Sequence, residues 1–202
     1  MHIVIKSTKE QQSSLAAIFS NSGASITWID DINHVPKADL YFNHSFDEDG
    51  FTFPMISQKP IFLNAVVGYG NLIPSNCIRY NGWPGFLNNA QIEIAANNSI
   101  ILNEATQILN GLTIKTLIAP DQPGMISARV VSMIINEAYF GLGDKISTKK
   151  EIDIAMKLGT NYPFGPFEWS ELIGLKNIHA LLIKLNENST RYAIAPAMML
   201  EL

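Results

Sequence analysis

Few residues of this chain have the types and spacing of a chemical centre. Lys6 and Lys9 follow the apolar run "HIVI", where two ammonium groups could attract a phosphate, although solvated surface lysines give the same pattern. Cys77 is the only cysteine, so the sequence offers no disulfide and no thiolate metal site, and no metal is expected. The net charge is −4 and no basic block occurs, which disfavours nucleic acid as a partner.

The elements that must position any such residues change in type near residue 120. Before that point, one helical pattern is "KEQQSSLAAIFSNSG", with Leu15, Ile18 and Phe19 on one face, and another is "SIILNEATQILNGL". Weaker strand candidates are "NCIRYN" and "QIEIAA". Strands are predicted at 2–5, 25–30, 38–43, 59–66 and 113–120. The alternation of strands and helices predicts a parallel sheet of the α/β type.

From Asp121 onward the pattern is helical. In "GMISARVVSMIINEAYFGLG", the i+4 spacing predicts an amphipathic helix whose apolar row is Ile126, Val130, Ile134 and Ala138. In "STKKEIDIAMKLG" the first Thr and the Glu three residues later predict a capping box. "PFEWSELIGL" and "KNIHALLIKLNE" predict two further helices. The chain therefore divides into an α/β domain at 1–120 and an all-α domain at 121–202.

The segment "KLGTNYPFGPFEWSELIGLK" lies between helical patterns, yet it is rich in glycine, proline and aromatic residues. Such a composition predicts a hinge, because Pro163 and Pro166 fix φ and remove donors while Gly165 allows a tight bend. The aromatic side chains have a large apolar surface to bury, in the core, at a dimer interface or against a substrate: Phe164, Phe167 and Trp169.

Three segments of this half carry a family resemblance: "DQPGMISARVVSMIINEA", "EIDIAMKLGTNYPFGPFEWSELIGL" and "RYAIAPAMMLEL". Together they resemble the C-terminal domain of the 3-hydroxyacyl-CoA dehydrogenases, a family of fatty-acid oxidation. The resemblance implies a helical bundle that forms a dimer interface and one wall of an acyl-CoA cleft. The expected fold is thus α/β plus all-α, a truncated Rossmann-like parallel sheet at 1–120 followed by the helical domain at 121–202.

The dinucleotide fingerprint of that family is missing. Its G-x-G-x-x-G lets the backbone approach a pyrophosphate at a helix N-terminus. Here "HIVI" is followed by "KSTKEQ", in which the side chains of Lys6, Thr8 and Gln11 should obstruct that approach. Asp30 or Asp31 stands at the position that binds a ribose hydroxyl in the family. We expect no cofactor, or NAD if a divergent site still works.

The resemblance also locates the catalytic positions. Asn64 in "LNAVVG" matches an asparagine of the family, but Val66 stands where a serine contacts the substrate oxygen. Glu93 in "IEI" matches the carboxylate partner of the catalytic histidine, whereas Asn81 in "YNGWPG" occupies the histidine position itself. The implied catalytic site is therefore a vestigial set of Glu93, Asn81 and Asn64.

These replacements bear on the reaction. Oxidising a 3-hydroxy group needs a base that takes the alcohol proton while hydride leaves, and Asn81 cannot hold a proton as a histidine does. His44 follows a predicted strand and is a candidate for a displaced base; otherwise it is an exposed loop histidine. Two further asparagines of the family are replaced by Pro84 and Ala128, while Arg129 is kept.

Three functions remain open. The chain is a degenerate relative that binds acyl-CoA or a partner without redox turnover, an active NAD-dependent 3-hydroxyacyl-CoA dehydrogenase with a divergent site, or a non-catalytic interaction module. The expected partner is a second copy, bound through the helical domain. No apolar run reaches membrane-spanning length and "MHIVIKSTKE" lacks the order of a signal peptide, so a cytoplasmic protein without membrane contact is expected.

Overall fold

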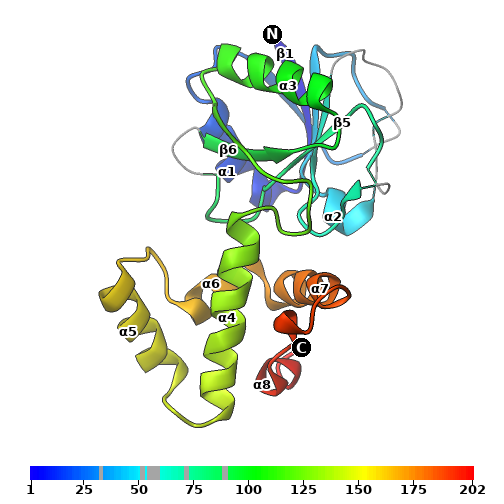
Figure 1. Ribbon diagram of the computed structural model, residues 1–202. Helices are drawn as coiled ribbons and strands as arrows, with labels where there is room; N and C mark the ends of the chain where they lie inside the picture. The colour runs from blue at the N-terminus through cyan, green and yellow to red at the C-terminus, as the bar shows by residue number, and fades with distance from the viewer. Residues whose placement is uncertain (32–33, 51–52, 54–59, 71–72, 88–90) are drawn as a thin grey trace. The chain divides into compact units, whose positions relative to one another are not determined.

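The computed structural model describes residues 1–31, 34–50, 53, 60–70, 73–87 and 91–202. The described chain forms two compact units, Met1–Met125 and Ile126–Leu202 (Figure 1). The first unit is built on a sheet and the second is made of helices. The predicted combination of an α/β half with an all-α half is confirmed.

A seven-stranded sheet organises the first unit, in the order β2-β1-β3-β4-β5-β6-β7. Each strand ends within two residues of its predicted end. The predicted start of the fourth strand, Lys59, lies outside the described residues. The strands are β1 (His2–Lys6), β2 (Ser25–Ile29), β3 (Leu40–Asn43), β4 (Ile61–Asn64), β5 (Cys77–Tyr80), β6 (Gln91–Ala95) and β7 (Lys115–Ile118).

The sheet is mainly parallel, as predicted, but one pair of described strands runs antiparallel. β1 to β5 pair in parallel, and so do β6 and β7, but β5 and β6 pair antiparallel. The connection from β5 to β6 contains no helix among its described residues, and a parallel return needs a crossover of a dozen or more residues. The reversal places Asn81, just after β5, opposite Glu93 in β6.

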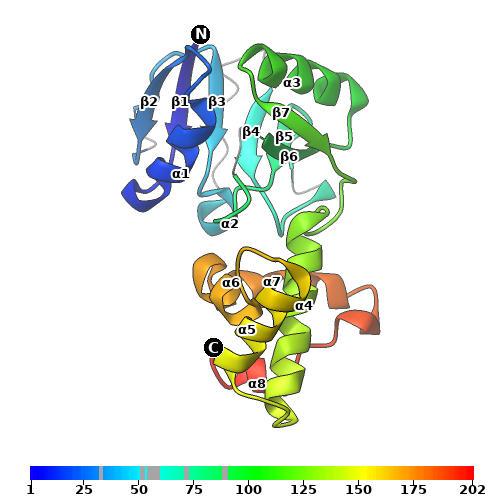
Figure 2. The same cartoon turned by 90° about the vertical axis from the view of Figure 1, so that its left-hand side faces the viewer.

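Two helices cover one face of the sheet, α1 (Lys9–Phe19) and α3 (Ser99–Gly111) (Figures 1 and 2). As predicted, α1 buries Leu15, Ile18 and Phe19, which pack against strand side chains such as Phe42. The opposite face is covered by α2 (Phe46–Asp49) and by loop residues. The strands therefore have apolar neighbours on both faces, as is usual for buried parallel strands.

The second unit contains α4 (Ser127–Gly143), α5 (Lys149–Thr160), α6 (Pro166–Ile173), α7 (Leu175–Asn186), a short 3-10 helix η2 (Thr190–Tyr192) and α8 (Pro196–Met199). The predicted capping box at the start of α5 is confirmed, because the Thr148 side chain accepts from the Glu151 N–H and Glu151 accepts from the Thr148 N–H. No helix in the described ranges is both long and apolar enough to cross a bilayer.

The long helix α4 buries a different row from the one predicted. Ala138 is buried, but Ile126 is 40% exposed and Val130 is 50% exposed. The buried residues of α4 are Ala128, Ser132, Ile135, Asn136, Ala138 and Tyr139. Small and polar side chains on this row allow close packing, and Asn136 bonds the backbone of Ala193 and Ala195, each over 2.9 Å. Periodicity located the apolar row but not the side that neighbouring helices cover.

The predicted hinge between α5 and α6 is locked by side chains. Asp153 of α5 accepts a 2.8 Å hydrogen bond from the backbone N–H of Phe167, in the first turn of α6. Glu168 accepts from the Gly165 N–H over 2.9 Å and forms an ion pair with Lys157. A Cβ on Gly165 would overlap the backbone and side chain of Asp153, so this close approach requires glycine.

Candidate functional site

Asn81 and Glu93, which the resemblance places at a catalytic pair, lie side by side. The Asn81 Nδ2 donates to Glu93 Oε2 over 3.3 Å, and both side chains are buried. The backbone N–H of Asn81 also donates to the Glu93 carbonyl over 3.0 Å, which continues the antiparallel pairing of β5 with β6. The carboxylate thus has its expected neighbour, but that neighbour is an amide that cannot carry a proton.

Asn64, the third residue of the predicted site, connects this pair to His44. Its Oδ1 accepts from the Gly82 N–H over 2.8 Å, and its Nδ2 donates to the His44 carbonyl over 2.9 Å. A Cβ on Gly82 would lie 2.7 Å from both Asn64 Cγ and His44 Cε1. The backbone therefore passes so close to the two side chains that only glycine fits between them.

His44 is buried, not the exposed loop residue that the sequence suggested as its ordinary role. Its Nδ1 lies 2.8 Å from the Tyr80 hydroxyl, and the two rings are stacked. Burial lowers the pKa of His44 to about 4 and raises the pKa of Tyr80 well above its usual value. The sequence signal that could have revealed this contact is that both residues stand at the carboxyl ends of strands, where side chains of a parallel sheet converge.

Val66, which replaces the substrate-contacting serine of the family, is also buried. Its backbone N–H donates to Asp47 over 2.6 Å, and the next two N–H groups bond the same carboxylate. Burial raises the pKa of Asp47, while these three backbone bonds lower it. The role of Asp47 was not predicted from the sequence. Its carboxylate is stabilised by backbone N–H groups of the loop after β4. No polar side chain remains at position 66 to orient a substrate.

The N-terminus of α1, where the family resemblance implies a pyrophosphate, is closed by the chain's own side chains. The Thr8 N–H donates to Gln11 Oε1 over 3.0 Å, and the Gln11 N–H donates to the Thr8 carbonyl over 3.2 Å. The pKa of Glu10 is lowered by bonds from its own N–H and from the Thr8 hydroxyl. Lys6 is paired with Asp49 and is not a free solvated lysine. These residues fit a pyrophosphate poorly, because the N–H groups of Thr8 and Gln11 are already bonded and Glu10 adds a carboxylate.

Asp30 lies apart from the buried pair, at the end of β2. It borders a hollow of about 460 Å³ that is also lined by residues of the turn before α1 and by Trp28. The hydroxyl of Ser7, also in this lining, is buried and has no hydrogen-bond partner among the described residues. Asp31 is exposed and does not line the hollow. Of the two candidates for the ribose position, Asp30 thus borders a hollow together with the start of α1, and Asp31 does not.

The described residues contain no group of three or more His, Cys, Asp or Glu side chains placed to hold a metal ion. Cys77 is buried, and burial raises the pKa of its thiol to about 12, so the thiolate is scarce at neutral pH.

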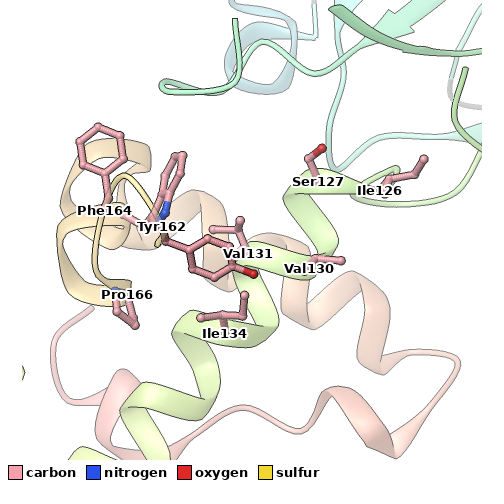
Figure 3. Close-up of a pocket in the computed structure, with 9 residues that line it drawn as sticks. Ile126, Ser127, Val130, Val131, Ile134, Tyr162, Phe164 and Pro166 are labelled. Carbon is pink, nitrogen blue, oxygen red and sulfur yellow. The ribbon is translucent and has the colours of Figure 1, made fainter. Parts of the chain in front are cut away.

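The helical unit has an apolar pocket of about 270 Å³ between α4 and the hinge. Figure 3 shows the Tyr162 ring pointing toward the aliphatic side chains of α4. The hinge aromatics divide between two roles: Phe164 and Trp169 line the pocket in edge-to-face contact, whereas Phe167 packs on Tyr139 in the core. We call this pocket the α4 groove; it is lined by Ile126, Ser127, Val130, Val131, Ile134, Tyr162, Phe164, Pro166 and Trp169.

The remaining positions of the family pattern are less informative. Pro84 is exposed beside Gly82, and Ala128 is buried within α4. Arg129 follows Ala128 on α4 and has an interaction partner. Ala128 and Arg129 belong to the helical unit, whereas Asn81, Glu93, Asn64 and His44 belong to the first unit.

Sequence comparison identifies the helical unit. Residues 124–202 match the family model described as "3-hydroxyacyl-CoA dehydrogenase, C-terminal domain". A 3-hydroxyadipyl-CoA dehydrogenase of Escherichia coli is 40% identical over 80 residues, which are 40% of this chain and 17% of the relative. A 3-hydroxybutyryl-CoA dehydrogenase of Clostridioides difficile is 38% identical over 80 residues, 39% of this chain and 28% of the relative. The match thus spans less than a third of either relative.

Structural comparison extends the likeness of fold to both units. The FadB2 protein of M. tuberculosis has a TM-score of 0.78 at 11% identity and covers 98% of this chain and 91% of its own. The (S)-3-hydroxybutyryl-CoA dehydrogenase of Ralstonia eutropha has a TM-score of 0.70 at 16% identity. This match covers 98% of this chain and 92% of that protein. At such identities these structures show the fold alone. The sequence of the helical unit is thus similar to the C-terminal domain of the 3-hydroxyacyl-CoA dehydrogenases over residues 124–202.

Proposed function

We propose that this chain does not oxidise 3-hydroxyacyl-CoA with NAD, and that it retains a binding role. One observation carries the proposal: the buried carboxylate of Glu93 holds the amide of Asn81 where the reaction needs a base. An amide can donate to the carboxylate but cannot take the proton of a substrate alcohol. The step that starts hydride transfer therefore has no acceptor for its proton at this position.

His44 does not replace the missing base. One ring nitrogen is engaged with Tyr80, and the ring is packed against Gly82. A pKa of about 4 makes its imidazole a weak proton acceptor at pH 7, because a general base works best with a pKa near the operating pH. At neutral pH His44 is therefore a poor candidate for the base.

The closed end of α1 supports the same proposal from the cofactor side. A bound pyrophosphate needs free N–H donors at the helix N-terminus and glycines that allow close approach. Here Gln11 accepts the Thr8 N–H and also lies within 3.3 Å of the Ser45 hydroxyl and 3.4 Å of Glu48. Because this network would have to be dismantled before a dinucleotide entered, we expect NADH to bind weakly or not at all.

The alternative function, an active NAD-dependent dehydrogenase with a divergent site, has two observations in its favour. Glu93 keeps the carboxylate of the catalytic pair, and Asp30 with the unpaired Ser7 hydroxyl borders a hollow at the sugar end of the cofactor position. The Glu93 carboxylate is already bonded to the Asn81 amide and Asp30 follows β2, at the far edge of the sheet from β6, so we rank this function second. A purely non-catalytic interaction module would share the same inactive site.

Calorimetric titration of the full chain with NADH and with acetoacetyl-CoA tests the proposal. We expect no saturable NADH binding below about 1 mM, which corresponds to roughly −4 kcal/mol, and no NADH oxidation when both are present. The Clostridioides difficile 3-hydroxybutyryl-CoA dehydrogenase serves as the positive control. A micromolar constant for NADH together with turnover of acetoacetyl-CoA would establish the alternative instead.

A further inference from the structure

The hollow at the end of β2 contains a polar group that the described chain leaves without a partner. It has a volume of about 460 Å³ and is lined by residues 7–10, Gln12 and residues 28–30; we call it the β2 hollow. The Ser7 hydroxyl in this lining is buried, and no described residue hydrogen-bonds to it. Native proteins rarely leave such a group unsatisfied, so a ligand or a water molecule is expected to complete its bonding.

Ser7 is held beside the end of β2 by a backbone hydrogen bond. Its N–H donates to the Ile29 carbonyl over 3.1 Å, which continues the parallel pairing of β1 with β2 and brings Ser7 next to Asp30 in the sheet. Both residues stand just after the carboxyl ends of neighbouring parallel strands, where the ligands of such sheets usually bind (Figure 2). The β2 hollow therefore has a hydroxyl and a carboxylate on adjacent strand ends.

The charges around the β2 hollow favour a cation. The pKa of Glu10 is lowered by its own N–H, by the Thr8 hydroxyl and, less strongly, by the charge of Lys9. Lys9 and Glu10 thus offset each other, and Asp30 adds a second carboxylate to the lining. The lining therefore carries one net negative charge, which attracts a monovalent cation and opposes a phosphate or a carboxylate.

Trp28 provides the β2 hollow with an aromatic wall. Its side chain is half-buried, since it packs against the apolar core of the first unit and also lines the hollow. An indole ring attracts ammonium groups, and it offers apolar surface to the body of a ligand. The volume of the hollow lies in the range of small-molecule sites, so a ring with a short chain has room there.

We infer that the β2 hollow binds a primary ammonium ligand with a short apolar body. The ammonium donates hydrogen bonds to the Asp30 carboxylate and to the Ser7 hydroxyl, while the body lies against Trp28. A primary ammonium has enough N–H donors for both acceptors, whereas a quaternary ammonium has none. The inference rests on the proposed function, because it names the ligand class of a binding role in which NADH has no part.

Titration of the full chain with 2-phenylethylamine, followed by tryptophan fluorescence and by calorimetry, tests this inference. Two probes of similar shape accompany the amine, the neutral 2-phenylethanol and the anionic 3-phenylpropionate. We expect the amine to bind saturably below about 1 mM, the alcohol to bind at least about tenfold more weakly, and the anion not to bind. Trp83 and Trp169 are buried, so the fluorescence change should come from Trp28 and disappear in Trp28→Phe.

Asp30→Asn should weaken binding of the amine at least about tenfold and Ser7→Ala about 2–10-fold, because each removes one acceptor of the ammonium. Asp31→Asn is the matched control, since it removes the same charge from the neighbouring residue, which does not line the hollow. This control should leave the affinity almost unchanged. Circular dichroism would verify that all three variants keep their fold.

Four results would overturn the inference: no binding of the amine, equal weakening by Asp30→Asn and Asp31→Asn, binding of the alcohol as tight as that of the amine, or a fluorescence change that persists in Trp28→Phe. The last result would place the amine beside Trp169 in the α4 groove. Saturable NADH binding would contradict the proposed function, whereas failure of the amine in a chain that does not bind NADH would contradict this inference alone.

Discussion

Asn81 and Glu93 are joined by two hydrogen bonds, one between their side chains over 3.3 Å and one between their backbone groups over 3.0 Å. The backbone bond fixes where any side chain at position 81 begins, relative to the carboxylate. An imidazole introduced at this position would therefore start from the place where the family has its histidine.

Asn81→His is expected to remain inactive. A general base typically supplies about 10²–10⁴-fold in rate, but Val66 provides no hydroxyl to orient a substrate, and at the start of α1 the Thr8 N–H is already bonded to Gln11. Catalytic groups that act as a unit are not restored one at a time. Spectrophotometric assay with NADH and acetoacetyl-CoA should show no oxidation above the unmodified chain. Clear turnover would mean that a cofactor binds by another route.

The free energy of unfolding of the first unit should decrease as the pH is lowered, because of His44. Its pKa is lowered to about 4 by burial, so the unfolded chain binds the proton more readily, and stability is complete above pH 6.5 and declines as pH falls toward 4. Between pH 7 and pH 5 the loss from this group is about 2 kcal/mol. Urea titrations at both pH values, with His44→Gln as the comparison, measure it; an equal loss in the variant would rule His44 out.

Asp121→Ala should destabilise the first unit by about 3 kcal/mol, as is usual when a buried ion pair loses one partner. Arg79 is fully buried, donates to Asp121 over 2.6 Å, and also bonds the carbonyls of Ala65, Val66 and Gln122. Denaturant midpoints would report the change. As a control, Glu187→Ala breaks the more exposed ion pair with Lys184 and should lower the free energy of unfolding by less than about 1 kcal/mol. Similar losses of stability in both variants would contradict the expectation.

Gly165→Ala should loosen the hinge. The added Cβ would overlap Asp153, including its backbone, and overpacking of this kind costs about 1–3 kcal/mol. Gly159→Ala in α5 is the control, since nothing lies within 4 Å of its Cβ and alanine favours a helix by about 0.5–1 kcal/mol. Thermal unfolding should therefore move in opposite directions for the two variants. A neutral Gly165→Ala would show that α5 can shift away from α6.

Local patterns predicted much of the fold. The buried face of α1 and the capping box of Thr148 with Glu151 could be read from spacing, because both depend on residues three or four apart. The antiparallel turn into β6 could not, because strand direction depends on how the chain returns and not on the composition of the strand.

The candidate site was predicted in part. The adjacency of Asn81 and Glu93 followed from the family spacing, whereas the burial of His44 did not, since it depends on Tyr80 and Gly82, which come more than 30 residues later. The exposed row of α4 was also missed, because periodicity alone does not tell which side of a helix has neighbours.

The hydrogen bonds at the N-terminus of α1 have a consequence for the cell if the proposed function holds. A dinucleotide-binding domain gains stability from its ligand in proportion to the logarithm of ligand concentration, about 2.7 kcal/mol at 100 times the dissociation constant. Under the proposed function, a unit whose helix end is bonded to Gln11 and Glu10 gains no such support from a dinucleotide. Its resistance to proteolysis and its abundance should then stay constant while nicotinamide pools rise and fall with nutrient supply.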